Sequence, residues 1–247
     1  ALVGGSAFHT DTEHYDNLQV GYDDGGPETF EDALEAEIAD RVEYSGIEPD
    51  YWTASGRTSA EWPDKENKAF WLKNGTEWFL QFQRFMASSP WQTWITPDGE
   101  PAVEIELDWF IGEVEARGYV DRIWENAVTG ALLVVDVKTG SREPGVKQLV
   151  TYHNGIAALF KAKDWGRAPI YGGYYMARKA MLTSPENIEG LDDGRLEYEY
   201  AAAARGITNQ VFLPSKSMLC GYCNVKDYCR EVGGDLAARE LPYSLLA

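Results

Sequence analysis

Three strand-like runs in quick succession constrain the fold of this chain more than any other feature. The first, residues 102–110, alternates apolar with acidic side chains, which is typical of a strand with one buried face. Residues 114–124 and 131–140 form the next two, and the Thr129-Gly130 pair between them suits a hairpin connection. Because strands joined by short connections can pair in antiparallel fashion, the sequence predicts an antiparallel group at the centre of the fold.

Helical patterns precede and follow these strands. In residues 28–44, apolar side chains recur at every fourth position, and residues 66–86 are dense in aromatic side chains, which indicates core packing. Residues 1–27 are expected to be irregular. The order of the elements predicts an α/β (α+β) fold in which helices flank a mixed central sheet. The later predicted elements are helices at 146–163 and 194–206 and a strand at 169–178.

Two aspartates and a lysine stand on the second and third strands. Asp121 and Asp136 belong to neighbouring strands, which run ~4.8 Å apart in a sheet, so their carboxylates can converge on one hard cation. Lys138 follows Asp136 by two residues and therefore points to the same face. A cation held by acids can polarise a phosphate and activate water, and a nearby ammonium group stabilises the developing charge. The group therefore predicts a phosphodiester-cleaving site.

The surroundings of this group favour a functional role. A D-x-K tripeptide by itself is common and usually decorates a surface. Here it ends a strongly apolar strand, and it is followed by Gln148 and Tyr152, which are four residues apart and share one face of the predicted helix.

Three motifs in this region resemble those of a known family, the PD-(D/E)XK nucleases. Within that family they resemble the RecB-type nuclease domains and the CRISPR-adaptation nucleases with a C-terminal cysteine cluster. The resemblance extends from about Phe70 to Arg230 and leaves the acidic N-terminal region outside. The matching segments are GYVDRI (118–123) for G-x-[IV]-D-R-[IV], VVDVKTG (134–140) for [DE]-x-K-T-G, and QLVTY (148–152) for Q-x-x-x-Y.

This resemblance implies a restriction-endonuclease-like core that binds Mg²⁺ or Mn²⁺. Lys138 would be the catalytic lysine, and the side chains of the helix motif would face DNA near the site. The implied site residues are Asp121, Asp136, Lys138, Gln148 and Tyr152, with the carbonyl of Val137 as a further metal ligand.

This sequence departs from the family pattern in one motif. These nucleases usually carry a histidine, or in some branches a glutamate, on the helix before the three strands, in a motif that begins with glycine. Segment 74–82 has the glycine, Gly75, but no histidine, so Glu77 is the expected metal ligand. Glu104 and Glu106 on the first strand are alternatives, although acids on the exposed face of a strand are ordinarily solvated.

All three cysteines fall in one short segment, with the C-x2-C spacing typical of metal ligands. In the resembling family such cysteines join a fourth to hold a structural [4Fe-4S] cluster, and zinc is the alternative. Here the fourth ligand either precedes Ala1, or is His9 or His14, or is absent from a relict cluster. The expected cofactor ligands are Cys220, Cys223 and Cys229.

The charge of the chain is unevenly distributed. The formal net charge is -18, yet residues 11–50 hold fourteen acids against one basic residue and Lys161–Lys179 is a basic stretch, so the overall sign does not exclude a DNA partner. No stretch is apolar enough to span a membrane, and no signal peptide is apparent, which predicts a cytoplasmic protein. We expect an acidic region at 1–50, a nuclease core at 51–212 and a cysteine-rich metal-binding appendage at 213–247.

The sequence therefore predicts a metal-dependent DNA nuclease, an exonuclease or DNA-end-processing enzyme of recombination, repair, phage replication or spacer acquisition. Its substrate would be single- or double-stranded DNA ends, with a helicase or annealing protein as a partner. A rival hypothesis is a nuclease-like scaffold that has lost its first metal ligand and binds DNA or a partner without cutting. A third makes the protein a zinc or iron-sulfur interaction protein whose acidic region is the working surface.

Overall fold

The computed structural model describes residues 2–52, 65–191, 194–211, 216–217, 220, 223 and 226–229. The chain divides into two compact units, Ala1–Glu197 and Tyr198–Ala247. The first unit includes both the acidic N-terminal region and the three strand-like runs, whereas the domain boundary expected at 212–213 lies outside the described residues. In the described part of the chain, none of the helices combines the length and the apolar character required to cross a membrane.

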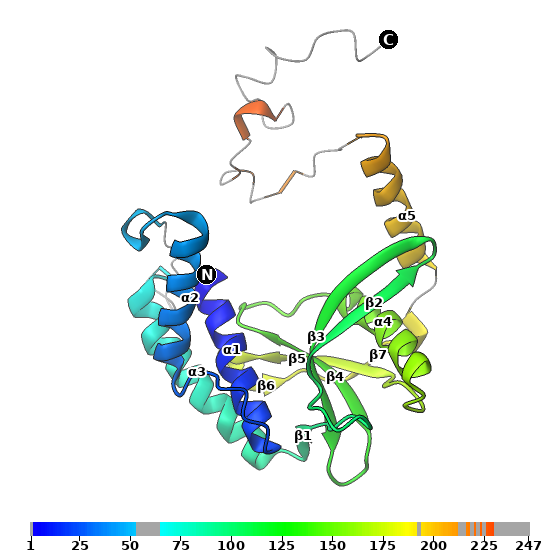
Figure 1. The fold of residues 1–247 in the computed structure, drawn as a ribbon, viewed down its shortest axis with the longest axis horizontal. Coiled ribbons are helices and arrows are strands. Elements are labelled where there is room, and N and C mark those ends of the chain that lie inside the picture. The colour runs from blue at the N-terminus through cyan, green and yellow to red at the C-terminus, as the bar shows by residue number, and fades with distance from the viewer. Residues whose placement is uncertain are drawn as a thin grey trace. The chain divides into compact units, whose positions relative to one another are not determined.

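A mixed sheet forms the centre of the first unit (Figure 1). Its strand order is β1-β3-β4-β5-β6, with β2 paired to β3 and β7 paired to β5. The β4–β5 pair is parallel and every other pair is antiparallel, which confirms the predicted fold class. The strands are β1 Trp91–Thr93, β2 Val103–Ile111, β3 Val114–Asn126, β4 Leu132–Lys138, β5 Tyr171–Met176, β6 Met181–Leu182 and β7 Glu186–Asn187.

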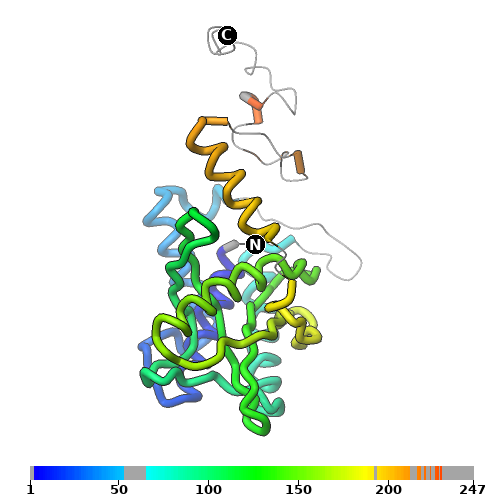
Figure 2. Tube along the Cα trace, turned by 90° about the vertical axis from the view of Figure 1, so that its right-hand side faces the viewer, coloured from blue at the N-terminus to red at the C-terminus, as the bar shows by residue number. Residues whose placement is uncertain are grey.

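Helix α4 (Lys147–Lys163) supplies the crossover between the parallel strands β4 and β5 and packs over one side of the sheet (Figures 1 and 2). A Cβ at Gly155 would lie 2.7 Å from Leu107 Cδ1 and 3.0 Å from the Trp109 ring, so glycine allows the close approach of α4 to β2. The first turns of α4 follow the end of β4 after a short loop. The crossover therefore returns Gln148 and Tyr152 to the strand end that carries Asp136.

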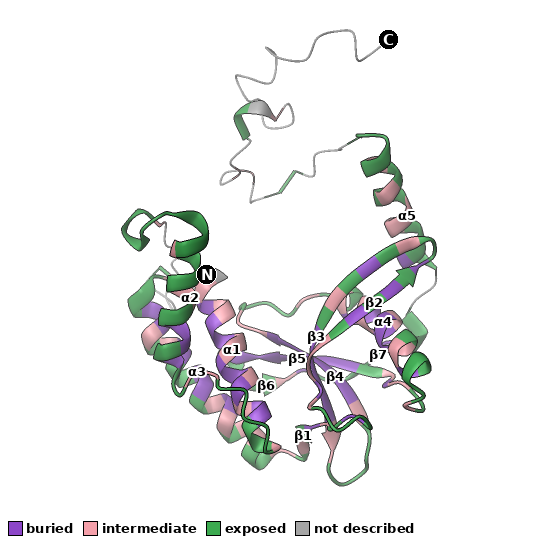
Figure 3. Ribbon diagram, in the orientation of Figure 1, coloured by how far each residue is buried: buried purple, intermediate pink, exposed green. Residues whose placement is uncertain are grey.

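Helices α1 (Leu2–Gln19), α2 (Phe30–Ser45) and α3 (Lys68–Ser88) pack together and form the main hydrophobic core with the sheet. Phe82 is fully buried, and its ring centroid lies 5.0 Å from that of Tyr175 on β5. Buried residues concentrate in β3 to β5 and on the helix faces turned toward them (Figure 3). The sheet residues in this core are Trp124, Leu133, Val135, Val137 and Tyr175.

The prediction that residues 1–27 are irregular is wrong, because α1 is a regular helix. Among the α1 side chains that the structure describes, the buried apolar ones are Ala7 and Phe8, and Val3 and Tyr15 pack against the core while partly buried. The other buried side chains of this helix are polar, so hydrophobic periodicity does not reveal the helix. Those buried polar residues are Asp11, Thr12, His14, Asp16 and Asn17.

The predicted helices α2, α3, α4 and α5 (Arg195–Thr208) are confirmed with small shifts of their ends. Thr29 caps α2 by accepting a hydrogen bond from the backbone N–H of Asp32, and Gly46 ends the helix in the left-handed conformation, with φ 64°. A Cβ at Gly75 would lie 2.2 Å from Phe30 Cζ, so this glycine allows α3 to pack closely against Phe30 of α2.

Candidate active site

Asp121 and Asp136 come together where the β3–β4 ladder ends. The last register pair at that end is Arg122 with Val135, so the two aspartates are the next residues along each strand. Asp121 Oδ2 accepts a hydrogen bond from the backbone N–H of Val137 at 2.8 Å. Both aspartates are buried. Because each is the next residue after the last register pair, the order of residues along the two strands is enough to bring the two acids together.

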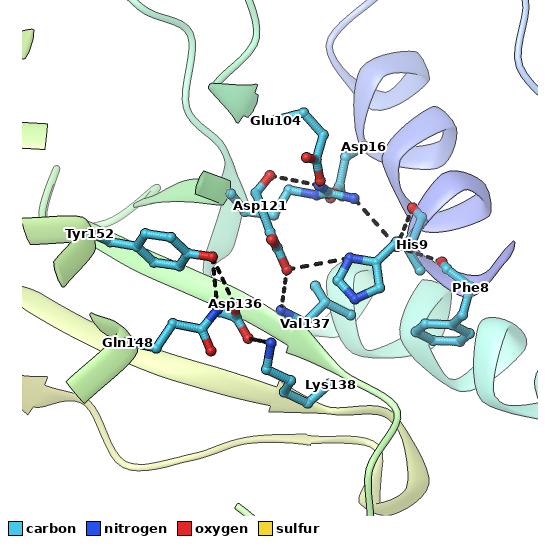
Figure 4. Close-up of polar contacts among 12 residues, drawn as sticks. Phe8, His9, Asp16, Glu104, Asp121, Asp136, Val137, Lys138, Gln148 and Tyr152 are labelled. Carbon is cyan, nitrogen blue, oxygen red and sulfur yellow. Dashed lines mark hydrogen bonds and ion pairs between the residues drawn. The ribbon is translucent and has the colours of Figure 1, made fainter. Parts of the chain in front are cut away.

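Asp136 is surrounded by the three other residues expected in the site (Figure 4). Lys138 Nζ lies 2.5 Å from Asp136 Oδ2. On the other side, Gln148 Nε2 donates to Asp136 Oδ1 at 2.8 Å, and the Tyr152 hydroxyl lies 3.4 Å from the same oxygen. Burial and the neighbouring charge of Asp121 raise the pKa of Asp136, Lys138 opposes the rise, and the resulting pKa is about 7.

Helix α1 brings a histidine to this edge that the sequence did not assign to the site. His9 Nδ1 lies 3.4 Å from Asp121 Oδ2 (Figure 4). One ligand atom each from His9, Glu104 and Asp121 lies within 4.8 Å of the others. Burial lowers the pKa of His9, with Arg122 and Lys138 acting in the same direction and Asp121 against it. A neutral imidazole is the form that binds metal ions.

Glu77, the metal ligand expected on the preceding helix, does not lie in this cluster. It stands on the solvent-exposed face of α3, where it accepts a hydrogen bond from Gln81 and lies 3.9 Å from Arg84. Gly75, read as the start of the family motif, serves helix packing instead. The signal that could have located the ligand is in the segment GGSAFH, where Gly5 precedes His9 by about one helical turn.

Glu104 belongs to the site, whereas Glu106 does not. Glu106 lies 3.5 Å from Arg117 on the exposed β2–β3 hairpin. Glu104 has φ 47°, a left-handed conformation that costs a non-glycine residue about 1–3 kcal/mol in a strand. The register is the same on both sides of it, from Val103 paired with Arg122 to Ile105 paired with Val120. The strain is therefore local, and it accompanies the placement of the Glu104 carboxylate beside Asp121.

An open pocket of about 570 Å³ lies over this cluster. Burial and the charges of Asp121 and Glu13 raise the pKa of Glu104, whereas Arg122 lowers it, and the resulting pKa is about 7. Burial and mutual repulsion favour the protonated form of neighbouring acids, and a bound cation stabilises their ionised form. One imidazole nitrogen with several carboxylate oxygens is a donor set that suits a small divalent cation such as Mg²⁺ or Mn²⁺. The pocket is lined by Gly5, Ser6, His9, Thr10, Glu13, Glu104, Asp121, Val137, Lys138, Thr139 and Gly140.

The three cysteines are free thiols of intermediate burial in the second unit. The backbone N–H of Cys223 donates to the carbonyl of Cys220 at 3.3 Å, and the backbone N–H of Ser217 donates to Cys220 Sγ at 3.2 Å. Most of the predicted 213–247 appendage lies outside the described residues. Of the histidines considered as a fourth ligand, His9 lies beside Asp121 and His14 beside Asp24.

Comparison with known proteins extends the likeness to almost the whole chain. The family model described as the PD-(D/E)XK nuclease superfamily matches residues 1–230. The acidic N-terminal region is therefore inside the family match, and the expectation that it lies outside is wrong. A protein of Mycobacterium phage D29, the Gene 69 protein, is 28% identical over 186 residues, which cover 73% of this chain and 65% of that protein. The matched part is thus less than two thirds of the relative's own length.

Proposed function

Because the chain belongs to the PD-(D/E)XK nuclease superfamily, we propose that it is a Mg²⁺- or Mn²⁺-dependent deoxyribonuclease that degrades or trims DNA from its ends. Family membership indicates a metal-dependent nuclease and hence a phosphodiester hydrolase with a DNA substrate. The exonuclease mode, the preference for DNA ends and the choice of metal are our proposals.

One observation carries this proposal. The cluster of His9, Glu104 and Asp121 adjoins the buried Asp136 and its partner Lys138 at a single sheet edge, under an open pocket. Metal-binding groups beside a lysine provide both halves of a phosphodiester-cleaving site. The rival scaffold hypothesis depended on a missing first ligand, and the position of His9 beside Asp121 supports the nuclease over that rival.

The roles of the residues follow from their contacts. A divalent cation bound by Asp121, Asp136, His9 and the Val137 carbonyl would polarise the scissile phosphate and acidify water. Gln148 and Tyr152 hold Oδ1 of Asp136 and so fix the carboxylate against rotation. The Lys138 ammonium orients the attacking water and stabilises the charge that develops on the phosphate.

The sequence also supports finer proposals about setting and cofactor. The similarity to a phage protein favours phage DNA replication or recombination over repair or spacer acquisition, with action in the cytoplasm and a helicase or annealing protein as a partner. We propose a structural [4Fe-4S] cluster, or zinc in its place, on the three cysteines. The C-x2-C spacing of Cys220 and Cys223, with Cys229 six residues further on, supports this proposal. Broad visible absorption of freshly purified protein would distinguish iron-sulfur from zinc.

The function is tested with purified protein, Mg²⁺ or Mn²⁺, and linear or covalently closed circular DNA. We expect degradation of the linear form, and loss of at least about a hundredfold in Asp136→Asn and Lys138→Met. The matched control is Lys163→Met, which changes an exposed lysine paired with Asp98. Retained cleavage in Asp136→Asn and Lys138→Met, or equal cleavage without divalent metal, would overturn the proposal. Cleavage of closed circles would remove the preference for ends and leave the nuclease assignment.

A further inference from the structure

A fully buried arginine lies directly behind the metal-binding cluster. Arg122 follows Asp121 on β3, and its side chain is 0% exposed. Its Nη1 donates to the carbonyl of Asp121 at 2.6 Å and lies 3.4 Å from Glu104 Oε1. A buried charge of this kind is costly unless it is neutralised by a partner of opposite charge.

Helix α1 provides that partner. Asp16 is also 0% exposed, and its Oδ2 accepts from Arg122 Nε at 2.6 Å. Thr12, one turn earlier, accepts from Arg122 Nη2 at 3.3 Å. His9 precedes Thr12 by about another turn, so the residues that meet Arg122 share a helix face with the histidine of the cluster. Asp16 and Glu104 both accept hydrogen bonds from the Arg122 guanidinium, and Figure 4 shows these two acids close to each other.

The charges around Arg122 show what Asp16 contributes. If Asp16 were neutral, the full charge of Arg122 would act on Glu104 and Asp121, which both line the pocket. A positive charge close behind these acids opposes the entry of a second positive charge, and burial makes the opposition stronger than it would be in water. Asp16 itself does not line the pocket, so it acts on the cluster through Arg122.

We propose that Asp16 is a positioning residue that sets the divalent-cation affinity of the His9–Glu104–Asp121 cluster by neutralising Arg122. This inference rests on the proposed metal site and adds a determinant of its affinity that touches neither metal nor DNA. A merely structural Asp16–Arg122 pair would hold α1 on the sheet without affecting cation affinity in a folded variant.

The test is Mn²⁺ binding to the full-length protein, measured without DNA by calorimetry and by the electron paramagnetic resonance of free Mn²⁺. The variant Asp16→Asn keeps the shape of the side chain and removes its charge. We expect its Kd for Mn²⁺ at pH 8 to rise about tenfold, because close charges in a buried site interact by roughly the energy of one decade in affinity. At this pH the carboxylate of the parent is ionised, since burial raises the pKa of Asp16 only to about 6.

Two further variants make the result decisive. Asp108→Asn removes the carboxylate of an exposed ion pair with Arg117 on the neighbouring hairpin and should leave the Kd unchanged. The double variant Asp16→Asn/Arg122→Gln removes both buried charges, and it should bind Mn²⁺ more tightly than Asp16→Asn and within about threefold of the parent. The double variant also keeps the inference testable if Asp16→Asn does not fold, since it leaves no unpaired buried charge.

Three outcomes would overturn the inference. These are a parent-like Kd in folded Asp16→Asn, an equal rise in Asp108→Asn, and a double variant that binds no better than the single. Failure of the proposed function would look different, because a parent protein that binds Mn²⁺ but cuts no DNA would still give the predicted order of Kd values.

Discussion

Nδ1 of His9 on the first helix lies 3.4 Å from Oδ2 of Asp121 on the third strand. This contact makes the N-terminal helix a wall of the candidate active site. The acidic N-terminal region, which we expected outside the likeness to the nuclease family, thus places a side chain beside the candidate site.

The first prediction compares the two candidate ligands. His9→Gln should lower divalent-dependent DNA cleavage by at least about tenfold and weaken Mn²⁺ binding, because it replaces an imidazole ligand with an amide. Glu77→Gln should leave both properties at the parent level, since Glu77 contacts only Gln81 and Arg84 among the partners identified. Cleavage rates and Mn²⁺ titrations of the two variants decide between the helices. If Glu77→Gln lost activity and His9→Gln did not, the metal ligand would be Glu77 on α3.

The second prediction concerns the strained backbone of Glu104. Asn tolerates the left-handed conformation better than Glu does, so Glu104→Asn should leave the free energy of unfolding unchanged or raise it by about 1 kcal/mol. The same change removes a carboxylate from the cluster and should weaken Mn²⁺ binding. Urea unfolding and metal titration measure the two effects. Glu106→Asn on the same strand should alter neither the stability by more than about 0.5 kcal/mol nor the metal affinity.

The third prediction uses the pH dependence of stability. Asp11 on α1 is buried, and burial together with Asp32 raises its pKa from 3.8 to about 7. The folded chain therefore holds a proton that the unfolded chain releases between about pH 4 and pH 7, so this group makes stability fall as pH rises through that window. Asp11→Asn should match the parent near pH 4 and exceed it by up to about 4 kcal/mol at pH 8, because each unit of pKa shift corresponds to about 1.4 kcal/mol.

Urea denaturation at the two pH values measures this difference. Asp40→Asn, a change of an exposed acid on α2, is the control and should follow the parent at both values. An Asp11→Asn variant that gains nothing at pH 8 would show that the buried carboxylate finds compensation in the folded state.

The fourth prediction concerns the loop that follows Lys138. Arg178 Nε donates to the carbonyl of Thr139 at 2.6 Å, and its guanidinium lies 4.9 Å from the ring centroid of Trp78. Arg178→Lys keeps the charge but loses the planar fork and the stacking. We expect the free energy of unfolding to fall by about 1–3 kcal/mol and the rate of DNA cleavage to fall several-fold. Arg167→Lys, in an exposed pair with Glu189, is the matched control and should change neither.

The local sequence determined the parts of this protein that depend on near neighbours in the chain. Strand register and alternation place Asp121, Asp136 and Lys138 together where the β3–β4 pairing ends. Helical spacing places Gln148 and Tyr152 on one face of α4. These relationships follow from the fixed geometry of strands and helices, so they can be read without the fold.

Tertiary structure alone decided how α1 completes the site. The buried face of α1 is largely polar, and Asp16 and Thr12 on it bind the distant Arg122, so no hydrophobic period marks the helix or its docking surface. The contact of His9 with Asp121 and the strained placement of Glu104 arise only when segments remote in the chain pack together. Such contacts depend on which surfaces bury one another, and a single sequence carries no local signal for that choice.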